Sequence, residues 1–252
     1  HIERMPLEDL HSLQEDRLKF VVRYVYDHSA FYRQRFKEAG ITPEDIKTLA
    51  DVAKLPFTKK ADLRDNYPTG MFSAPKNQVV RYHVSSGTTG KPTVVGYTRG
   101  DIETWSESLA RALTSLGLSR DDVVQVGYGY GLFTGGLGLH YGAERMGAAV
   151  LPVGTGNTER QIELMQDLGT TAIACTPSYF LHIMEVAEKM GVSIRNDTQL
   201  KVGIFGAEPW SLETRKRIEA NTGINAYDIY GTSEISGPLF TECQAKNGIH
   251  IW

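Results

Sequence analysis

A segment rich in glycine and hydroxyl side chains has the composition of a phosphate-binding loop. Its seven residues include two glycines, four hydroxyl residues and a lysine, so backbone N–H groups and hydroxyls can surround a polyphosphate while the lysine adds a positive charge. It is not a Walker loop, because only two residues separate the glycines and a proline follows the lysine. A solvated turn would explain Gly-Thr-Thr-Gly alone, but the complete string favours phosphate binding. The residues are Ser85, Ser86, Gly87, Thr88, Thr89, Gly90 and Lys91.

A second candidate segment follows an apolar run near the end of the chain. Its sequence is Asp228-Ile229-Tyr230-Gly231-Thr232-Ser233-Glu234. Tyr230 offers a flat face for a nucleobase, and Glu234 is a hard oxygen ligand suited to Mg²⁺ on phosphates. The alternative is a strand followed by a helix with Thr232 or Ser233 as its cap. A third segment, Gly206-Ala207-Glu208-Pro209, follows another apolar run. It would close the same ligand-binding crevice as the second segment.

The elements that position these segments have an α/β pattern. From about residue 79, apolar runs of four or five residues alternate with amphipathic stretches, which predicts a mainly parallel sheet flanked by helices. The apolar runs are 123–126, 149–153, 171–175, 202–205 and 226–229, and the helical stretches are 137–146, 162–168, 179–190 and 212–220. In open α/β sheets, ligands bind beyond the carboxyl ends of the strands, where the candidate segments would emerge.

The residues before the sheet are expected to be helical. Leucine and valine recur at helical spacing through the first 25 residues, and a second short helix is predicted over 31–39, ended by Gly40. We therefore expect a helical N-terminal segment over residues 1–78 and an α/β core over residues 79–252. Tyr24 and Tyr26 on the first helix indicate either a homodimer interface or packing against the chain's own sheet.

Composition excludes several classes of protein. The chain has 252 residues and a formal net charge of −3, so it has no overall basic field for nucleic acid or an anionic membrane. Its two cysteines, Cys175 and Cys243, are too few for a disulfide scaffold and fit a reduced cytosol. No apolar run approaches the roughly 20 residues of a membrane-spanning helix. We expect a soluble cytoplasmic protein.

The end of the chain suggests a further domain. Residues 248–252 have the pattern of a strand with no turn or polar tail after it, so we expect the chain to be part of a longer protein. Cys243 and His250 form a C-x6-H pair beside this end. They would supply half of a structural zinc site, which takes four ligands.

The three candidate segments, in this order and at about these separations, resemble those of the adenylate-forming enzymes. These enzymes include acyl-CoA synthetases, luciferases and the adenylation domains of peptide synthetases. The resemblance is strongest to the phenylacetate–CoA ligase branch and covers essentially the whole chain. The segments that carry it are Leu55-Pro56-Phe57-Thr58-Lys59-Lys60, Asp62-Leu63-Arg64-Asp65-Asn66-Tyr67-Pro68, Pro92-Thr93-Val94-Val95-Gly96-Tyr97-Thr98 and Tyr128-Gly129-Tyr130-Gly131-Leu132-Phe133-Thr134-Gly135-Gly136.

This resemblance implies ligation of an aryl acid to coenzyme A through an acyl adenylate, with ATP and Mg²⁺. It implies that Ser85–Lys91 hold the β- and γ-phosphates, that Glu234 binds Mg²⁺, and that Thr232 lies near the α-phosphate. The catalytic residues would be Lys91, Thr232 and Glu234. Gly206, Ala207, Glu208, Pro209, Asp228, Ile229, Tyr230 and Gly231 would frame adenine and ribose. The acid pocket would comprise Tyr128, Phe133, Gly135, Gly136, Ala207, Ile229 and Pro238.

The resemblance also leaves alternatives open. The acid is expected to be phenylacetate, with benzoate or indoleacetate as the nearest rivals, because one methylene in an apolar pocket changes affinity by only about 1–3 kcal/mol. A nucleotide-binding relative without catalysis is the rival from another class. The family continues beyond the Tyr-Gly-Thr-Ser-Glu segment to a ribose-binding aspartate, a hinge and a C-terminal lid domain with a catalytic lysine. These are absent here, so we expect this chain alone to adenylate poorly or not at all.

Overall fold

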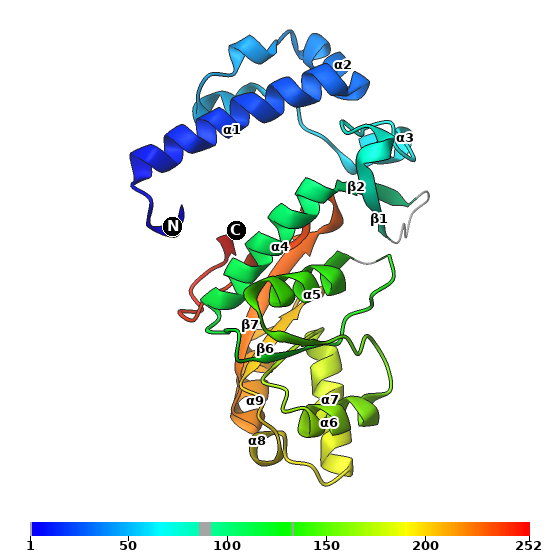
Figure 1. The fold of residues 1–252 in the computed structure, drawn as a ribbon, viewed down its shortest axis with the longest axis vertical. Coiled ribbons are helices and arrows are strands. Elements are labelled where there is room, and N and C mark those ends of the chain that lie inside the picture. Colours follow the sequence, from blue (N-terminus) through cyan, green and yellow to red (C-terminus); the bar gives the residue numbers. More distant parts are fainter. Residues whose placement is uncertain (1, 86–91, 133) are drawn as a thin grey trace. The chain divides into compact units, whose positions relative to one another are not determined.

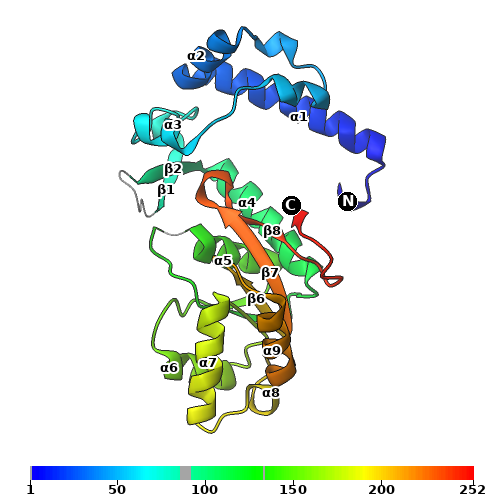
Figure 2. The same ribbon diagram turned by 180° about the vertical axis from the view of Figure 1, so that it is seen from behind.

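The computed structural model describes residues 2–85, 92–132 and 134–252. The chain divides into two units, His1–Thr98 and Arg99–Trp252, which are drawn in Figures 1 and 2 and are treated separately below. The expected division into a helical segment over 1–78 and a core over 79–252 stays a prediction. Among the described residues, none of the helices combines the length and the apolar character that crossing a bilayer requires.

The first unit consists of helices followed by a hairpin. Its α-helices are α1 (Leu7–His28), α2 (Ala30–Ala39) and α3 (Lys60–Asp65), and its 3₁₀ turns are η1 (Ile2–Arg4), η2 (Pro43–Asp45), η3 (Leu49–Lys54) and η4 (Lys76–Gln78). Strands β1 (Val79–Ser85) and β2 (Thr93–Thr98) pair antiparallel. The predicted helix over 31–39 is confirmed by α2. Gly40 ends it with φ 67°, a left-handed conformation that glycine adopts without a steric penalty. Val22, Phe36 and Ile46 form the core of this unit.

The second unit is an α/β layered structure. Its helices are α4 (Arg99–Ser115), α5 (Thr134–Met146), α6 (Thr158–Asp167), α7 (Pro177–Lys189), α8 (Ile194–Asp197) and α9 (Leu212–Thr222), with one 3₁₀ turn, η5 (Ser233–Ile235). Its strands are β3 (Val123–Val126), β4 (Ala149–Leu151), β5 (Ala172–Cys175), β6 (Val202–Gly206), β7 (Asn225–Thr232), β8 (Gly237–Thr241) and β9 (His250–Ile251).

The sheet of this unit is mainly parallel, as predicted. Its strand order is β4-β3-β5-β6-β7-β8-β9, and the first five strands in that order pair parallel while β8 and β9 are antiparallel. All residues of β5 and β6 are buried, so both faces of the sheet are covered. One face packs on α6, α7, α8 and α9 around Phe180 and Phe205, whose ring centroids lie 5.0 Å apart. Helices α4 and α5 pack on each other and contact β8, which Figure 2 shows beside β7.

Each predicted strand is present, and β7 is longer than predicted. The apolar run ends at Ile229, yet the strand continues to Thr232, because β8 folds back antiparallel and pairs with Ile229, Tyr230 and Thr232. The second candidate segment therefore lies largely within a strand.

Candidate functional site

A cavity of about 170 Å³ opens at the carboxyl ends of the central strands. Its walls come from the turn after β3, the first half of α5, the residue after β6, the end of β7 and the start of β8. Parallel strands end at one edge of a sheet, so these segments, distant in sequence, meet there. The lining residues are Tyr128, Thr134, Gly135, Leu139, Ala207, Ile229, Gly231, Thr232, Ser233, Gly237 and Pro238.

The structure brings together most of the residues expected to form the acid pocket. Five of them line this cavity: Tyr128, Gly135, Ala207, Ile229 and Pro238. Gly136 is buried beside the cavity, where a Cβ would lie 2.7 Å from the carbonyl oxygen of Gly129. Phe133 lies outside the described residues.

Tyr128 anchors one wall of the cavity. Its side chain is buried, and its hydroxyl donates a hydrogen bond of 2.7 Å to the backbone oxygen of Cys175, the last residue of β5. Burial, with a smaller effect of the Cys175 thiol, raises the pKa of Tyr128 well above its usual range. The hydroxyl therefore stays protonated and hydrogen-bonded to Cys175, and the residue contributes its ring to the cavity.

Glycines let α5 place its first turn at the cavity. A Cβ on Gly138 would lie 2.5 Å from Cζ2 of Trp105, and a Cβ on Gly142 would overlap Leu109, so only glycine allows α5 to approach α4 this closely. Gly237, at the start of β8, also lies against the Trp105 ring, because a Cβ added to it would be 3.1 Å from Trp105 Cζ2. Trp105 thus lies against both the α5 wall and the β8 wall.

The segment after β6 combines strain with a structural hydrogen bond. Ala207 has φ 67°, an uncommon conformation for a residue with a side chain, and it lines the cavity. Such strain is concentrated at functional sites. The neighbouring Glu208 accepts a 2.7 Å hydrogen bond from the backbone N–H of Ser178, in the first turn of α7. Its carboxylate therefore has a structural role at a helix N-terminus.

Two of the predicted nucleotide-binding glycines have a packing role in the sheet. A Cβ on Gly206 would overlap the carbonyl oxygen of Ile229, and a Cβ on Gly231 would overlap the backbone of Gly237. Close approach of neighbouring strands thus requires glycine at both positions, independently of any ligand.

The remaining residues of the second segment differ in exposure. Asp228 accepts a 3.0 Å hydrogen bond from Trp210 Nε1 through its Oδ1 atom. Tyr230 is 57% exposed, so its side chain is accessible to a ligand. Thr232 lines the cavity. Glu234 is exposed in η5 and has no hydrogen-bond or ion-pair partner among the residues that the structure describes.

Most of the expected phosphate loop lies outside the described residues. Residues 86–91, which include Lys91, lie outside the described residues, and Ser85 is the last residue of β1 in the first unit. The loop is therefore supported by its sequence alone.

Four cavity residues were not predicted from sequence: Thr134, Leu139, Ser233 and Gly237. Thr134 Oγ1 donates a 3.0 Å hydrogen bond to Ser233 Oγ, which joins two residues of the cavity lining. Leu139 lies one helical turn after Gly135 on the same face of α5, so helical spacing from that glycine was the available signal. Gly237 stands between Ser236 and Pro238 in a typical turn sequence, which was the signal for a backbone reversal there.

The zinc expectation at Cys243 and His250 is not supported. Over residues 2–85, 92–132 and 134–252, no three His, Cys, Asp or Glu side chains lie close enough to hold a metal ion. His250 lies in β9 opposite Thr241, and its ring packs near Trp252, with centroids 5.6 Å apart. Without further ligands, the pair cannot complete a tetrahedral site.

Comparison with known proteins points to one family. Residues 8–249 match the family described as AMP-binding enzyme. The whole chain is 53% identical to the phenylacetate-coenzyme A ligase of Aromatoleum evansii and 51% identical to that of Pseudomonas putida, and it spans 57% of the length of each. An open conformation of 2-hydroxyisobutyryl-CoA ligase, in complex with 2-HIB-AMP and CoA, superposes with a TM-score of 0.92 at 31% identity. That alignment covers 98% of this chain and 60% of the ligase.

Proposed function

The chain belongs to the AMP-binding enzyme family, and on that basis we propose that it is the acid- and nucleotide-binding part of an ATP-dependent aryl-acid–CoA ligase acting on phenylacetate. In the first step, a carboxylate oxygen attacks the α-phosphorus of ATP, and the bond to the β-phosphate breaks to release pyrophosphate. In the second step, the thiol sulfur of coenzyme A attacks the acyl carbon. The thioester forms, the bond to AMP breaks, and the thiol proton is released.

The cavity is the observation that carries this proposal. A cavity of about 150 Å³ lined by apolar side chains is large enough for benzene, and this one measures about 170 Å³. Tyr128, Leu139 and Ile229 give it apolar walls, which would hold a ring and exclude water from the carboxylate. The relatives at about 50% identity are phenylacetate-coenzyme A ligases, which supports the same acid here.

The nucleotide would lie beside the cavity, at the ends of β6 and β7. We propose that residues 206–209 together with Asp228, Ile229, Tyr230 and Gly231 frame adenine and ribose. Thr232, at the cavity wall, would contact the α-phosphate. Ser85 and residues 86–91 would hold the β- and γ-phosphates through amides, hydroxyls and Lys91. Preorganised donors of this kind stabilise the charge that develops on phosphate oxygens.

Glu234 fits a role in binding the magnesium of Mg–ATP. Magnesium on nucleotides is held by one or two carboxylates together with phosphate oxygens and water. Glu234 presents such a carboxylate, exposed and without a partner among the described residues, close in sequence to the cavity residue Thr232. Bound there, magnesium would neutralise phosphate charge.

Three broader features complete the proposal. Coenzyme A is the proposed thiol substrate. The two-cysteine composition supports a cytoplasmic location. The helix with Tyr24 and Tyr26 is a candidate surface for a homodimer. The chain spans little more than half the length of its curated relatives, so full turnover is proposed for the full-length protein.

The test is calorimetric binding of two non-hydrolysable acyl-adenylate mimics to the full-length protein, one phenylacetyl and one hexanoyl, with AMP as the common control. We expect the phenylacetyl mimic to bind at least about 10-fold more tightly, because only its ring matches the cavity. Equal affinities would retain the adenylate site and contradict the aryl acid. No binding of either mimic would contradict the proposal as a whole.

A second measurement separates the ligase from a non-catalytic nucleotide-binding relative. Full-length protein incubated with ATP, phenylacetate and coenzyme A is expected to form AMP and thioester in equal amounts. Omission of the acid should stop AMP release. Benzoate and indoleacetate, supplied in place of phenylacetate, test the rival acids. Nucleotide binding without thioester from any of these acids would favour the non-catalytic relative.

A further inference from the structure

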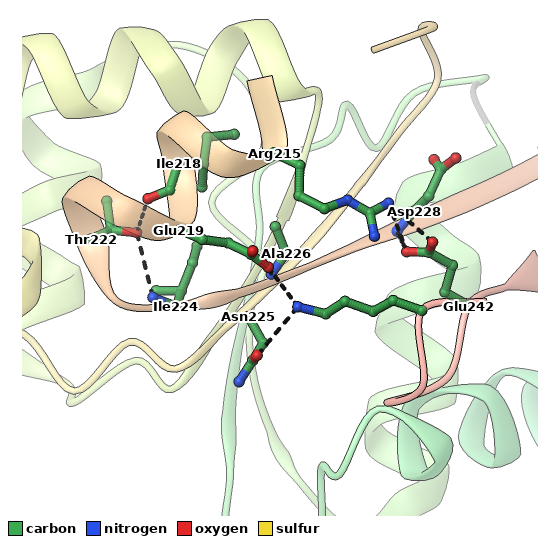
Figure 3. Close-up of polar contacts among 10 residues, drawn as sticks. Arg215, Ile218, Glu219, Thr222, Ile224, Asn225, Ala226, Asp228 and Glu242 are labelled. Carbon is green, nitrogen blue, oxygen red and sulfur yellow. Dashed lines mark hydrogen bonds and ion pairs between the residues drawn. The ribbon is translucent and has the colours of Figure 1, made fainter. Parts of the chain in front are cut away.

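Among the residues that the structure describes, no strand pairs with one edge of the first half of β7. Strand β8 pairs with β7 only from Ile229 onward, so the N–H groups of Ala226 and Asp228 on this edge have no strand partner. Two carboxylates take their place. Ala226 N donates to Glu219 Oε1 at 3.0 Å, and Asp228 N donates to Glu242 Oε2 at 2.7 Å (Figure 3). Buried backbone donors need such acceptors.

Each of these carboxylates pairs with a cation. Glu219 contacts Lys246 Nζ at 2.5 Å. Glu242 contacts Arg215 at 2.9 Å (Figure 3). The two pairs differ in burial, because the side chains of Arg215 and Glu242 are 15% and 8% exposed, whereas those of Lys246 and Glu219 are 21% and 30% exposed. The pair next to Asp228 is therefore the more strongly shielded from water.

The Arg215 pair continues into a closed ring of contacts that includes Trp210, whereas Lys246, beyond Glu219, contacts β7 through Asn225 and the Tyr227 ring. The Arg215 guanidinium lies over the Trp210 ring, 5.0 Å from its centroid, in a cation–π arrangement. Trp210 Nε1 donates to Asp228 Oδ1 at 3.0 Å. The backbone N–H of Asp228 donates to Glu242, and Glu242 binds Arg215. Trp210 directly follows residues 206–209, so the ring connects this segment with β7.

The ring controls where one candidate nucleotide ligand lies. Asp228 is held on three sides: Trp210 binds its carboxylate, Glu242 accepts its N–H, and the N–H of Glu242 donates to its carbonyl oxygen at 3.1 Å. Its Oδ2 atom has no hydrogen bond to the described residues and remains available for a ligand. Side chains fixed in this way keep a binding group in place before the ligand arrives.

We propose that Arg215 and Glu242 are positioning residues for the nucleotide, which act by holding Trp210 and Asp228 in place. This inference rests on the proposed function, since it takes residues 206–209 and Asp228 as the nucleotide site. Neither residue belongs to the segments that we propose to contact the nucleotide. The neighbouring pair, Glu219 and Lys246, makes the same kind of contact to β7 but has no contact with residues 206–210 among the described interactions, so it serves as an internal control.

The test compares Arg215→Met with Lys246→Met in the full-length protein, with dissociation constants for AMP and for phenylacetate measured separately by calorimetry. Each substitution removes a cation from a carboxylate that binds a β7 N–H group. We expect Arg215→Met to weaken AMP binding about 3- to 10-fold, the effect of losing one hydrogen-bond contribution. Phenylacetate binding should change less than about 2-fold, and Lys246→Met should leave both constants near wild type.

A double variant keeps the test decisive if Arg215→Met folds poorly. Arg215→Met with Glu242→Gln removes both charges, so no unpaired buried carboxylate remains. It is expected to fold and still to bind AMP weakly. Unchanged AMP affinity in this variant, or an equal loss in Lys246→Met, would overturn the inference.

The outcomes also separate this inference from the proposed function. Wild-type protein that binds AMP but forms no thioester would contradict the ligase, while weaker AMP binding by Arg215→Met would still support the positioning role. Wild-type protein that binds no AMP would overturn both.

Discussion

The α5 wall of the cavity and the free edge of β7 hold their backbone segments in position by opposite means. At the α5 wall, glycines remove side chains so that Gly138 and Gly142 contact Trp105 and Leu109 directly. At the β7 edge, charged side chains are added, and Arg215 with Glu242 replaces a missing strand. Close packing is short-ranged and independent of salt, whereas a partly buried ion pair depends on both partners being present. The acid site and the nucleotide site should therefore respond to different perturbations.

The largest effect is expected when one charge is removed at the β7 edge. Arg215→Met leaves the Glu242 carboxylate buried without its cation, and the free energy of unfolding should fall by about 3 kcal/mol. Lys246→Met should cost about 1 kcal/mol, because Glu219 is more exposed and retains access to water. Urea unfolding of both variants measures the difference. Equal losses would show that burial does not distinguish the two pairs.

A smaller loss is expected when a methyl group is added at the α5 wall. In Gly142→Ala, the new Cβ overlaps Leu109, so α4 and α5 must separate, at a cost of about 2 kcal/mol. Gly129→Ala is the matched control, because no atom lies within 4 Å of its added Cβ. Thermal unfolding should show a larger loss of stability for Gly142→Ala than for Gly129→Ala. Relative to wild type, Gly142→Ala should weaken phenylacetate binding more than it weakens AMP binding. A Gly142→Ala variant as stable as wild type would contradict this prediction, because it would show that α4 and α5 separate without a measurable cost.

The smallest effect is expected at Tyr128, which lines the cavity with its ring and makes a hydrogen bond to the sheet with its hydroxyl. Tyr128→Phe keeps the ring in the cavity and removes the hydrogen bond to Cys175, so stability should fall by about 1 kcal/mol with phenylacetate affinity unchanged. Loss of acid binding in this variant would assign the hydroxyl a direct role.

The same variant has a pH signature. Burial raises the pKa of Tyr128 in the folded protein above its value of about 10 in the unfolded chain, so the unfolded state loses this proton first as pH rises. The contribution of Tyr128 to stability is complete below pH 10 and declines above it. Urea unfolding from pH 9 to 11 should therefore show a shallower decline for Tyr128→Phe than for wild type.

The sequence could predict elements that depend on local pattern. The buried strands, the Gly40 helix end and the terminal strand follow from apolar runs and from conformational preferences of single residues. The length of β7 could not be predicted, because the continuation to Thr232 depends on β8 folding back. The contact of Arg215 with Glu242 joins positions 27 residues apart and depends on the end of β8 reaching α9.

The candidate site divides in the same way. Residue pattern alone predicted segments at the carboxyl ends of strands, and the resemblance to adenylate-forming enzymes identified Tyr128, Ala207 and Ile229 as neighbours. Neither indicated Leu139 or Gly237, since their positions in the wall depend on the close packing of α5, β8 and Trp105.

That packing has an evolutionary consequence. The Trp105 ring lies against Gly138 on one wall of the cavity and Gly237 on the other, so its size sets how far apart the two walls lie. A lineage that replaces this tryptophan with a smaller or differently shaped residue changes the width of the cavity while keeping every residue that lines it. New acid preferences can then arise from a single codon outside the pocket, and homologues with identical linings can differ in the acids they accept.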